Sequence, residues 1–134
     1  MIDISKVGDR WVLPVVGQLV AQVSVDYAVT LCLINNVAVR IEQQFVISTK
    51  NGEEYTIIPA GDLSQLAPVL TLARSILTEG FAFEDGHLEL VFNDGARVFV
   101  PSSQDYEPWE IVGPAHMRII SAPGGELSVW LPNS

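Results

Sequence analysis

The sequence predicts a β-rich α+β fold of mainly antiparallel strands with one short helix near residues 62–73. Three observations predict it: runs rich in β-branched residues, short polar or Gly-containing breaks between these runs, and one segment with helical spacing. The chain has 134 residues, which is the usual size of one domain. We therefore expect 1–134 to form a single domain with its own core.

The first half of the chain is expected to hold a meander of three strands. Two short polar breaks, Asp26-Tyr27 and Asn35-Asn36, separate strands expected at 18–26, 28–34 and 37–48. The Asn-Gly pair in "KNGEE" then predicts a hairpin that leads into the strand "YTIIPA".

A second meander follows in "FAFEDGHLELVFNDGARVFV" (81–100), where two Asp-Gly turns separate three strands. Its middle strand alternates apolar and polar residues, which is typical of a strand with one buried face. The plan resembles that of 23–41, and two similar meanders would build either two sheets or one strongly curved sheet. The aligned apolar positions are Leu31, Leu33, Val39 and Ile41 in the first meander and Leu90, Phe92, Val98 and Val100 in the second.

The remaining elements are a helix and a last hairpin. The helix at 62–73 has Asp62 as its N-cap and is shortened by Pro68, and a strand is expected to resume in "RSILTEG". The last hairpin covers 117–131. The helix is expected to pack its leucines over the sheet, with helical spacing at Leu63, Leu66, Ala67 and Leu70.

Charge and hydropathy exclude several classes of protein. Asp plus Glu number 16 and Lys plus Arg 7, so the net charge is −9, and such a field repels nucleic-acid phosphates. The negative charge favours binding of a basic protein, or it only keeps the protein in solution. The hydrophobic share is 49% and the mean hydropathy +0.32, but no apolar run is long enough to cross a membrane. With no legible secretion signal in Met1–Arg10, we expect a soluble cytoplasmic protein, and the apolar excess favours a homodimer.

No catalytic, cofactor or metal site is predicted. His87 and His116 are the only histidines, lack metal-ligand spacing, and are expected to be exposed in loops. The single cysteine, Cys32, lies in an apolar run and is expected to be buried. Glu107 and Glu110 could form a carboxylate pair near Trp109, but the surrounding prolines favour a loop, which does not hold a catalytic pair rigidly.

The segment "DYEPWEIVGP" (105–114) is the candidate contact site. Aromatic side chains with an acidic rim are typical of a surface that binds a basic protein. In the alternative interpretation the two rings close the end of the sheet and the acids point to water. Trp11 and Trp130 belong either to the same surface or to the core. The predicted partner-binding residues are Tyr106, Glu107, Trp109 and Glu110.

Nearly the whole chain resembles a family of small bacterial proteins, frequent in actinobacteria, that is known only as a domain of unknown function. The resemblance is carried by the Tyr-Glu-x-Trp-Glu motif at 106–110 and the Pro-Gly-Gly-x-x-x-x-Trp motif at 123–130. Pro108 departs from the Ala common at that position. The first motif is also loosely similar to proteins grouped with immunity proteins of toxin systems. The resemblance implies a cytoplasmic bacterial protein and brings no catalytic residues.

The sequence therefore predicts a non-enzymatic protein-interaction module. The alternative is a small-ligand-binding protein with an apolar pocket between sheet and helix, lined by Leu66, Leu70 and Phe81.

Overall fold

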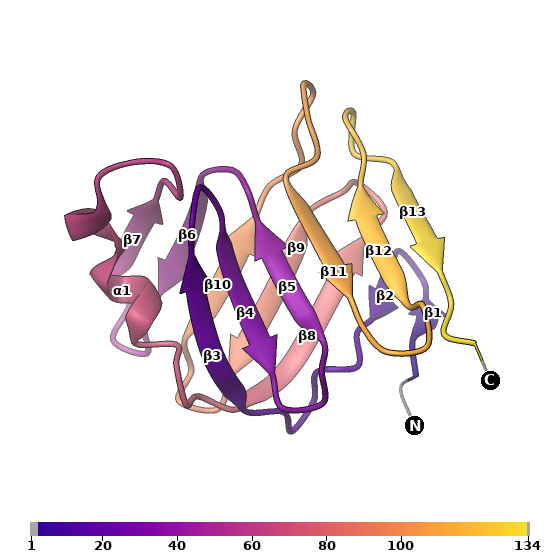
Figure 1. The fold of residues 1–134 in the computed structure, drawn as a ribbon, viewed down its shortest axis with the longest axis horizontal. Helices are drawn as coiled ribbons and strands as arrows, with labels where there is room; N and C mark the ends of the chain where they lie inside the picture. Colours follow the sequence, from indigo (N-terminus) through magenta and orange to yellow (C-terminus); the bar gives the residue numbers. More distant parts are fainter. Residues whose placement is uncertain (1–2, 134) are drawn as a thin grey trace.

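The computed structural model describes residues 3–133 as two antiparallel sheets that pack face to face with the core between them (Figure 1). The seven-stranded sheet has the order β1-β2-β8-β9-β10-β6-β7, and the six-stranded sheet has the order β13-β12-β11-β5-β4-β3. The strands are β1 (Ser5–Val7), β2 (Arg10–Val12), β3 (Val20–Val25), β4 (Val29–Leu33), β5 (Ala38–Ile41), β6 (Phe45–Ser48), β7 (Glu54–Ile57), β8 (Leu77–Phe83), β9 (Leu88–Phe92), β10 (Arg97–Val100), β11 (Trp109–Val112), β12 (Arg118–Ser121) and β13 (Leu127–Trp130).

The two predicted meanders are confirmed, and each belongs to a different sheet. β3-β4-β5 lies in the six-stranded sheet and β8-β9-β10 in the seven-stranded sheet. Every hairpin of both meanders contains an Asx turn, in which an Asp or Asn side-chain oxygen accepts a hydrogen bond from the backbone N–H two residues later. These bonds are Asp26–Ala28 (2.7 Å), Asn35–Val37 (3.3 Å), Asp85–His87 (3.0 Å) and Asp94–Ala96 (2.9 Å).

The alternating residues of the two meanders meet in the core. In β9 the side chains of Leu88, Leu90 and Phe92 are buried while Glu89 and Val91 are partly exposed, as the alternation predicts. All eight aligned positions of the two meanders are buried, namely Leu31, Leu33, Val39, Ile41, Leu90, Phe92, Val98 and Val100. Two sheets, rather than one strongly curved sheet, are therefore the arrangement that this repeated pattern builds.

The predicted helix consists of two short turns. Asp62 caps η1 (Leu63–Leu66), a 3-10 turn, by accepting a hydrogen bond from the Ser64 backbone N–H at 2.9 Å. One turn of α-helix, α1 (Ala67–Leu70), follows with Pro68 near its start, where its missing N–H costs no hydrogen bond. Within residues 3–133 no helix reaches the length and hydropathy needed to cross a membrane.

The prediction that the leucines of this segment pack on the sheet is wrong for two of them. Leu66 is buried, but Leu63 and Leu70 are exposed, and Val69 and Leu72 are buried instead. After α1 the N–H groups of Thr71, Leu72 and Ala73 bond to the oxygens three residues earlier, so Val69 and Leu72 share the face that closes the core.

Three strands lie outside the sequence prediction. β1 and β2 extend the seven-stranded sheet at its edge, and β11 occupies 109–112, which the surrounding prolines indicated to be loop. Cys32 is partly exposed, because it lies on the outward side of β4 between the buried Leu31 and Leu33. The prediction of a buried cysteine is therefore wrong.

Candidate functional site

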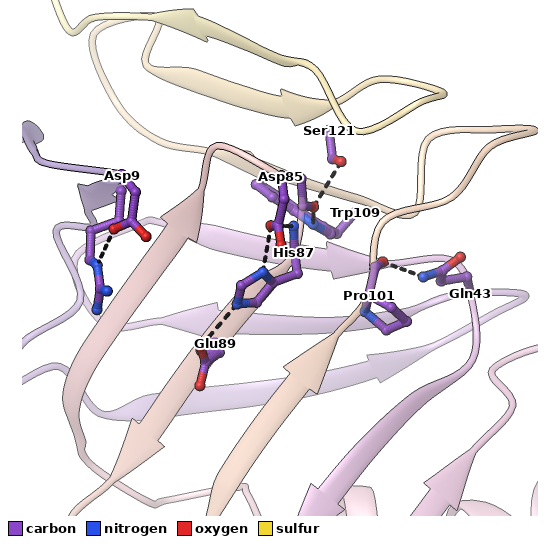
Figure 2. Close-up of polar contacts among 10 residues, drawn as sticks. Asp9, Gln43, Asp85, His87, Glu89, Pro101, Trp109 and Ser121 are labelled. Carbon is purple, nitrogen blue, oxygen red and sulfur yellow. Dashed lines mark hydrogen bonds and ion pairs between the residues drawn. The ribbon is translucent and has the colours of Figure 1, made fainter.

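Trp109 begins β11 and lies inside the sandwich. Its side chain is fully buried, and its indole Nε1 donates a hydrogen bond to the backbone oxygen of Gly86 at 2.9 Å (Figure 2). The prediction that Trp109 is a surface anchor is wrong, because a side chain with no exposed area cannot contact a partner. Its ring instead closes one end of the core, which was the alternative interpretation.

The same Gly86 oxygen also accepts a hydrogen bond from Ser121 Oγ at 2.9 Å. Gly86 and Gly125 lie in turns of different sheets, and both have positive φ. A Cβ on Gly86 would lie 2.5 Å from Gly125 Cα, and one on Gly125 would lie 2.3 Å from the Asp85 oxygen. Only glycine permits this approach, which explains the second glycine of the Pro-Gly-Gly motif.

The other three predicted contact residues do not form one surface with Trp109. Tyr106, half exposed, and Glu107, exposed, lie in the loop before β11. Glu110 lies on the outer face of the six-stranded sheet and accepts a hydrogen bond from Arg118 Nε at 2.7 Å. The Arg118 guanidinium also lies 5.7 Å from the ring centre of Trp130, which is half exposed.

The outer face of the seven-stranded sheet carries a group of aromatic side chains that sequence reasoning missed. Phe83 lies between two flat groups, with the His87 ring stacked at 4.0 Å between centroids and the Arg10 guanidinium 4.3 Å from its centroid. Phe99 lies on the other side of His87, at 5.1 Å between centroids. We call Arg10, Phe83, His87 and Phe99 the aromatic stack.

His87 is held in place by two carboxylates. Its ring Nδ1 lies 2.5 Å from Oδ1 of Asp85, and its Nε2 lies 3.0 Å from Oε2 of Glu89 (Figure 2). Only 18% of the His87 side chain is exposed, so the prediction of an exposed loop histidine is wrong. Desolvation acts to raise the pKa of the Asp85 carboxyl, but hydrogen bonds from the His87 backbone N–H and ring hold that pKa below its ordinary value of 3.8.

Both nitrogens of His87 face carboxylates, and neither forms a hydrogen bond to a hydroxyl or thiol among the described residues. A nucleophile activated by a histidine needs such a bond. Over residues 3–133, no three His, Cys, Asp or Glu side chains are grouped as ligands of a metal ion.

A family model covers residues 11–131 of this chain, and it describes a family of unknown function, DUF6188. The chain belongs to the DUF6188 family. No curated protein and no solved structure matches it.

The DUF6188 match includes the loop with Tyr106 and Glu107, and it includes the aromatic stack except for Arg10, which immediately precedes residue 11. Membership confirms the resemblance to a domain of unknown function. Because the family has no assigned activity, it transfers no role to any residue of this chain.

The structure brings two of the three predicted pocket residues together. Leu66, which is buried, and Leu70, which is exposed, both line a groove beside Val25. Phe81 lies on the outer face of the seven-stranded sheet, where the Arg10 guanidinium is 5.3 Å from its ring centroid. The predicted pocket is therefore wrong in including Phe81, whereas Leu66 and Leu70 do line one groove.

A different groove lies between β7 and the helical turns. Its volume is about 630 Å³, and most of its polar lining consists of hydroxyl and amide groups. Glu54 is the only charged side chain among its lining residues, which are Ile47, Thr49, Glu54, Tyr55, Thr56, Ser64, Gln65, Ala67, Pro68 and Thr71.

One signal in the sequence could have identified the aromatic face. In "GFAF" the two phenylalanines alternate with Gly80 and Ala82, so one side of β8 is small and the other is aromatic. Gly80 and Ala82 are buried, because Val15 and Leu90 press against the small side. The aromatic side is thereby left facing outward.

Proposed function

We propose that this protein is a non-enzymatic protein-interaction module that binds a basic protein. The observation that carries the proposal is the outward placement of Phe81, Phe83 and Phe99, three of the five phenylalanines in the chain. Phe99 is 42% exposed and Phe81 is partly exposed. Large apolar side chains on the solvent side of a sheet are typical of a binding surface.

The aromatic stack makes this surface rigid before a partner arrives. Phe83 is only 7% exposed although it faces outward, because Arg10 and His87 cover both of its faces. His87 in turn is fixed by Asp85 and Glu89. Side chains that are already ordered lose little conformational entropy on binding, which favours affinity.

The charges around the stack favour a basic partner. Arg10 at this face is already neutralised, since it lies 3.0 Å from Asp9, and Arg97 of β10 lies on the same side of the sheet as Phe99. The acidic groups that face no Lys or Arg within 4.0 Å in the described chain include Glu79, Asp85 and Glu89. Together with the net charge of −9, they attract a positively charged protein and speed its approach.

Tyr106 and Glu107 remain part of the proposal as a second contact. Both are exposed in the loop before β11, and neither is tied to the core by a side-chain hydrogen bond among those found in the described residues. Glu110, bonded to Arg118, contributes less, because a partner would have to compete with that ion pair.

The experiment is affinity capture of the tagged protein from a lysate of its source organism, repeated with variants of each surface. We expect a basic protein to be recovered in stoichiometric amount at low salt and shed at high salt. Phe99→Ser and Phe81→Ser should each reduce its recovery at least about tenfold, as for an aromatic hot spot. Tyr27→Ser is the matched control, because Tyr27 is 82% exposed in the turn between β3 and β4.

Three results would contradict part or all of this proposal. Unchanged recovery with both phenylalanine variants would exclude the aromatic face, and loss only with Tyr106→Ser or Glu107→Gln would transfer the contact to the loop. Recovery of the tagged protein alone would remove protein binding as the leading function.

Small-ligand binding is the second candidate, and the groove beside β7 is the observation that favours it. Because Glu54 is its one charged lining side chain, we expect a neutral or cationic polar ligand rather than an anion. Thermal shift measurements against panels of sugars, amines and carboxylates test this. A stabilising sugar or amine should lose its effect in Thr56→Val and keep it in Thr30→Val, which lies on the outer face of β4.

A further inference from the structure

The sandwich has four edge strands, and β3 is the longest of them. It has six residues, against three in β1 and four in β7 and β13. Lys6 lies in β1 and Glu54 in β7, whereas β13 lies between Glu126 and Pro132. Charged residues and prolines of this kind protect an edge from pairing with another chain. No charged residue or proline occurs within β3, and Asp26 follows its last residue.

The backbone of β3 offers hydrogen-bonding groups on its free side. In an antiparallel pair, residues alternate between those bonded to the neighbouring strand and those pointing away from it. Asp26 N–H bonds to the Ala28 oxygen at 3.0 Å, so the backbone groups of Val23 and Val25 point away from β4. Neither residue forms a backbone hydrogen bond to a loop or helical turn within residues 3–133.

Exposed apolar side chains lie beside the free edge of β3. Val25 is 37% exposed, Leu63 70% and Leu70 62%, and together they line a groove of about 250 Å³ between β3 and the helical turns. Figure 1 shows α1 beside β3 at the outer edge of the six-stranded sheet. The inward side chains of an added strand would lie on these leucines.

We propose that β3 pairs antiparallel with β3 of a second copy of this chain, joining the two six-stranded sheets across a two-fold axis. The pairing puts Val23 opposite Val25 of the partner subunit, and the reverse, with Ser24 at the axis. Each of the two Val23–Val25 pairs then closes two backbone hydrogen bonds. This dimer uses a surface separate from the aromatic stack, so it goes beyond the proposed function.

Charge complementarity favours a second copy over an unrelated strand. Asp26 follows one end of β3, and Arg74 lies at the other end, where its backbone N–H bonds to the Val20 oxygen at 2.8 Å. Antiparallel pairing brings the Asp26 end of each copy toward the Arg74 end of the other. Arg74 forms no ion pair in the described part of the chain, whereas Asp26 lies 3.4 Å from Arg40. The two-fold axis therefore brings Asp26 of each copy toward Arg74 of the other, which makes two pairs of opposite charges.

The β-bulge between Val20 and Gln22 limits how far the pairing extends. Beyond the bulge, the N–H of Val20 bonds to the Ser75 oxygen and its carbonyl to Arg74, so those groups are no longer available. The free part of the edge is therefore 22–26, which is the stretch the two-fold arrangement uses.

The test is sedimentation of the full chain over a range of concentrations. We expect a species of twice 14.6 kDa that dissociates on dilution. Val25→Pro should abolish it, because proline removes an N–H that points away from β4 and leaves the native ladder intact. Circular dichroism of Val25→Pro checks that the fold is kept. Arg74→Glu places a second carboxylate near Asp26 of the other copy, and this repulsion should raise the dimer dissociation constant roughly tenfold.

Leu63→Glu provides a variant outside the strand, and it should also give a monomer. Its matched control is Ile58→Glu, since Ile58 is 54% exposed but does not line the groove. A wild-type chain that stays monomeric at its highest soluble concentration overturns the proposal. So does a dimer that survives both folded variants, Val25→Pro and Leu63→Glu. Phe99→Ser should leave the dimer intact, so failure of this proposal and failure of the proposed function give different results.

Discussion

The indole Nε1 of Trp109 donates a hydrogen bond to the backbone oxygen of Gly86, and this bond joins the two sheets at one end of the sandwich. Trp109 begins β11 of the six-stranded sheet, and Gly86 lies in the turn between β8 and β9 of the seven-stranded sheet. Both groups are buried, so the bond is screened from water.

Replacing Trp109 should destabilise the fold strongly. Trp109→Ala removes the largest fully buried side chain and should lower the free energy of unfolding by about 3–5 kcal/mol. Trp109→Phe keeps most of the ring and loses the hydrogen bond, at a cost of about 1–3 kcal/mol. Urea unfolding followed by circular dichroism measures both. A Trp109→Ala protein as stable as the wild type would show that the ring does not close the core.

The contact between Gly86 and Gly125 should tolerate no side chain. Gly124 and Gly125 have φ of 91° and 96°, but a Cβ on Gly124 meets nothing within 4 Å. Gly124→Ala should therefore cost only the strain of the backbone conformation, about 1 kcal/mol. Gly125→Ala adds a clash with the Asp85 oxygen and should cost clearly more. Thermal unfolding of both variants makes the comparison, and equal losses would mean that the two turns separate readily.

The buried face of the helical turns is tested by two neighbouring residues. Val69→Ala should lower the free energy of unfolding by about 2 kcal/mol, because Val69 is fully buried. Leu70→Ala should change it by less than about 0.5 kcal/mol, because Leu70 is 62% exposed. Urea unfolding is measured on dilute protein, where self-association does not contribute. The reverse order would support the helical spacing that the sequence indicated.

Asp85 should contribute to the loss of stability in acid. Its pKa is lower in the folded protein than the ordinary 3.8, so ionised Asp85 stabilises the fold above that pH. This contribution is lost as the pH falls through the lowered folded-state pKa. Asp85→Asn should therefore be less stable than the wild type near neutral pH and lose less stability between pH about 5 and about 3. Urea unfolding at several pH values tests this, and parallel curves for the two proteins would contradict it.

The sequence predicted the fold wherever turn chemistry and alternation agree. Asp85-Gly86 and Asp94-Gly95 marked two hairpins, and the apolar residues of β9 showed which face is buried. β11 was missed because Pro108 and Pro114 indicated a loop. Those prolines lie outside the strand, where they remove no hydrogen bond between strands, and the Pro108 oxygen accepts one from the Glu42 N–H at 2.8 Å.

The candidate site was less predictable, because it depends on which side of a strand faces the core. The sequence marked Tyr106 and Trp109 as aromatic, but only packing decides that Trp109 is buried and Tyr106 is exposed. Likewise, the residues next to His87 in the sequence give no sign of the full stack. The ring of His87 lies on Phe83, and the other face of Phe83 is covered by Arg10, which comes from a strand far away in the sequence. Contacts of this kind arise from strand order, which alternation alone does not specify.

The approach of Gly86 to Gly125 also sets the order in which the protein can be completed during synthesis. Trp109 and Gly86 have both been made well before the turn that holds Gly125, so the end of the core stays open until the last hairpin forms. Folding of the sandwich is therefore complete only once the β12–β13 hairpin has been added, and contacts so distant in sequence form slowly.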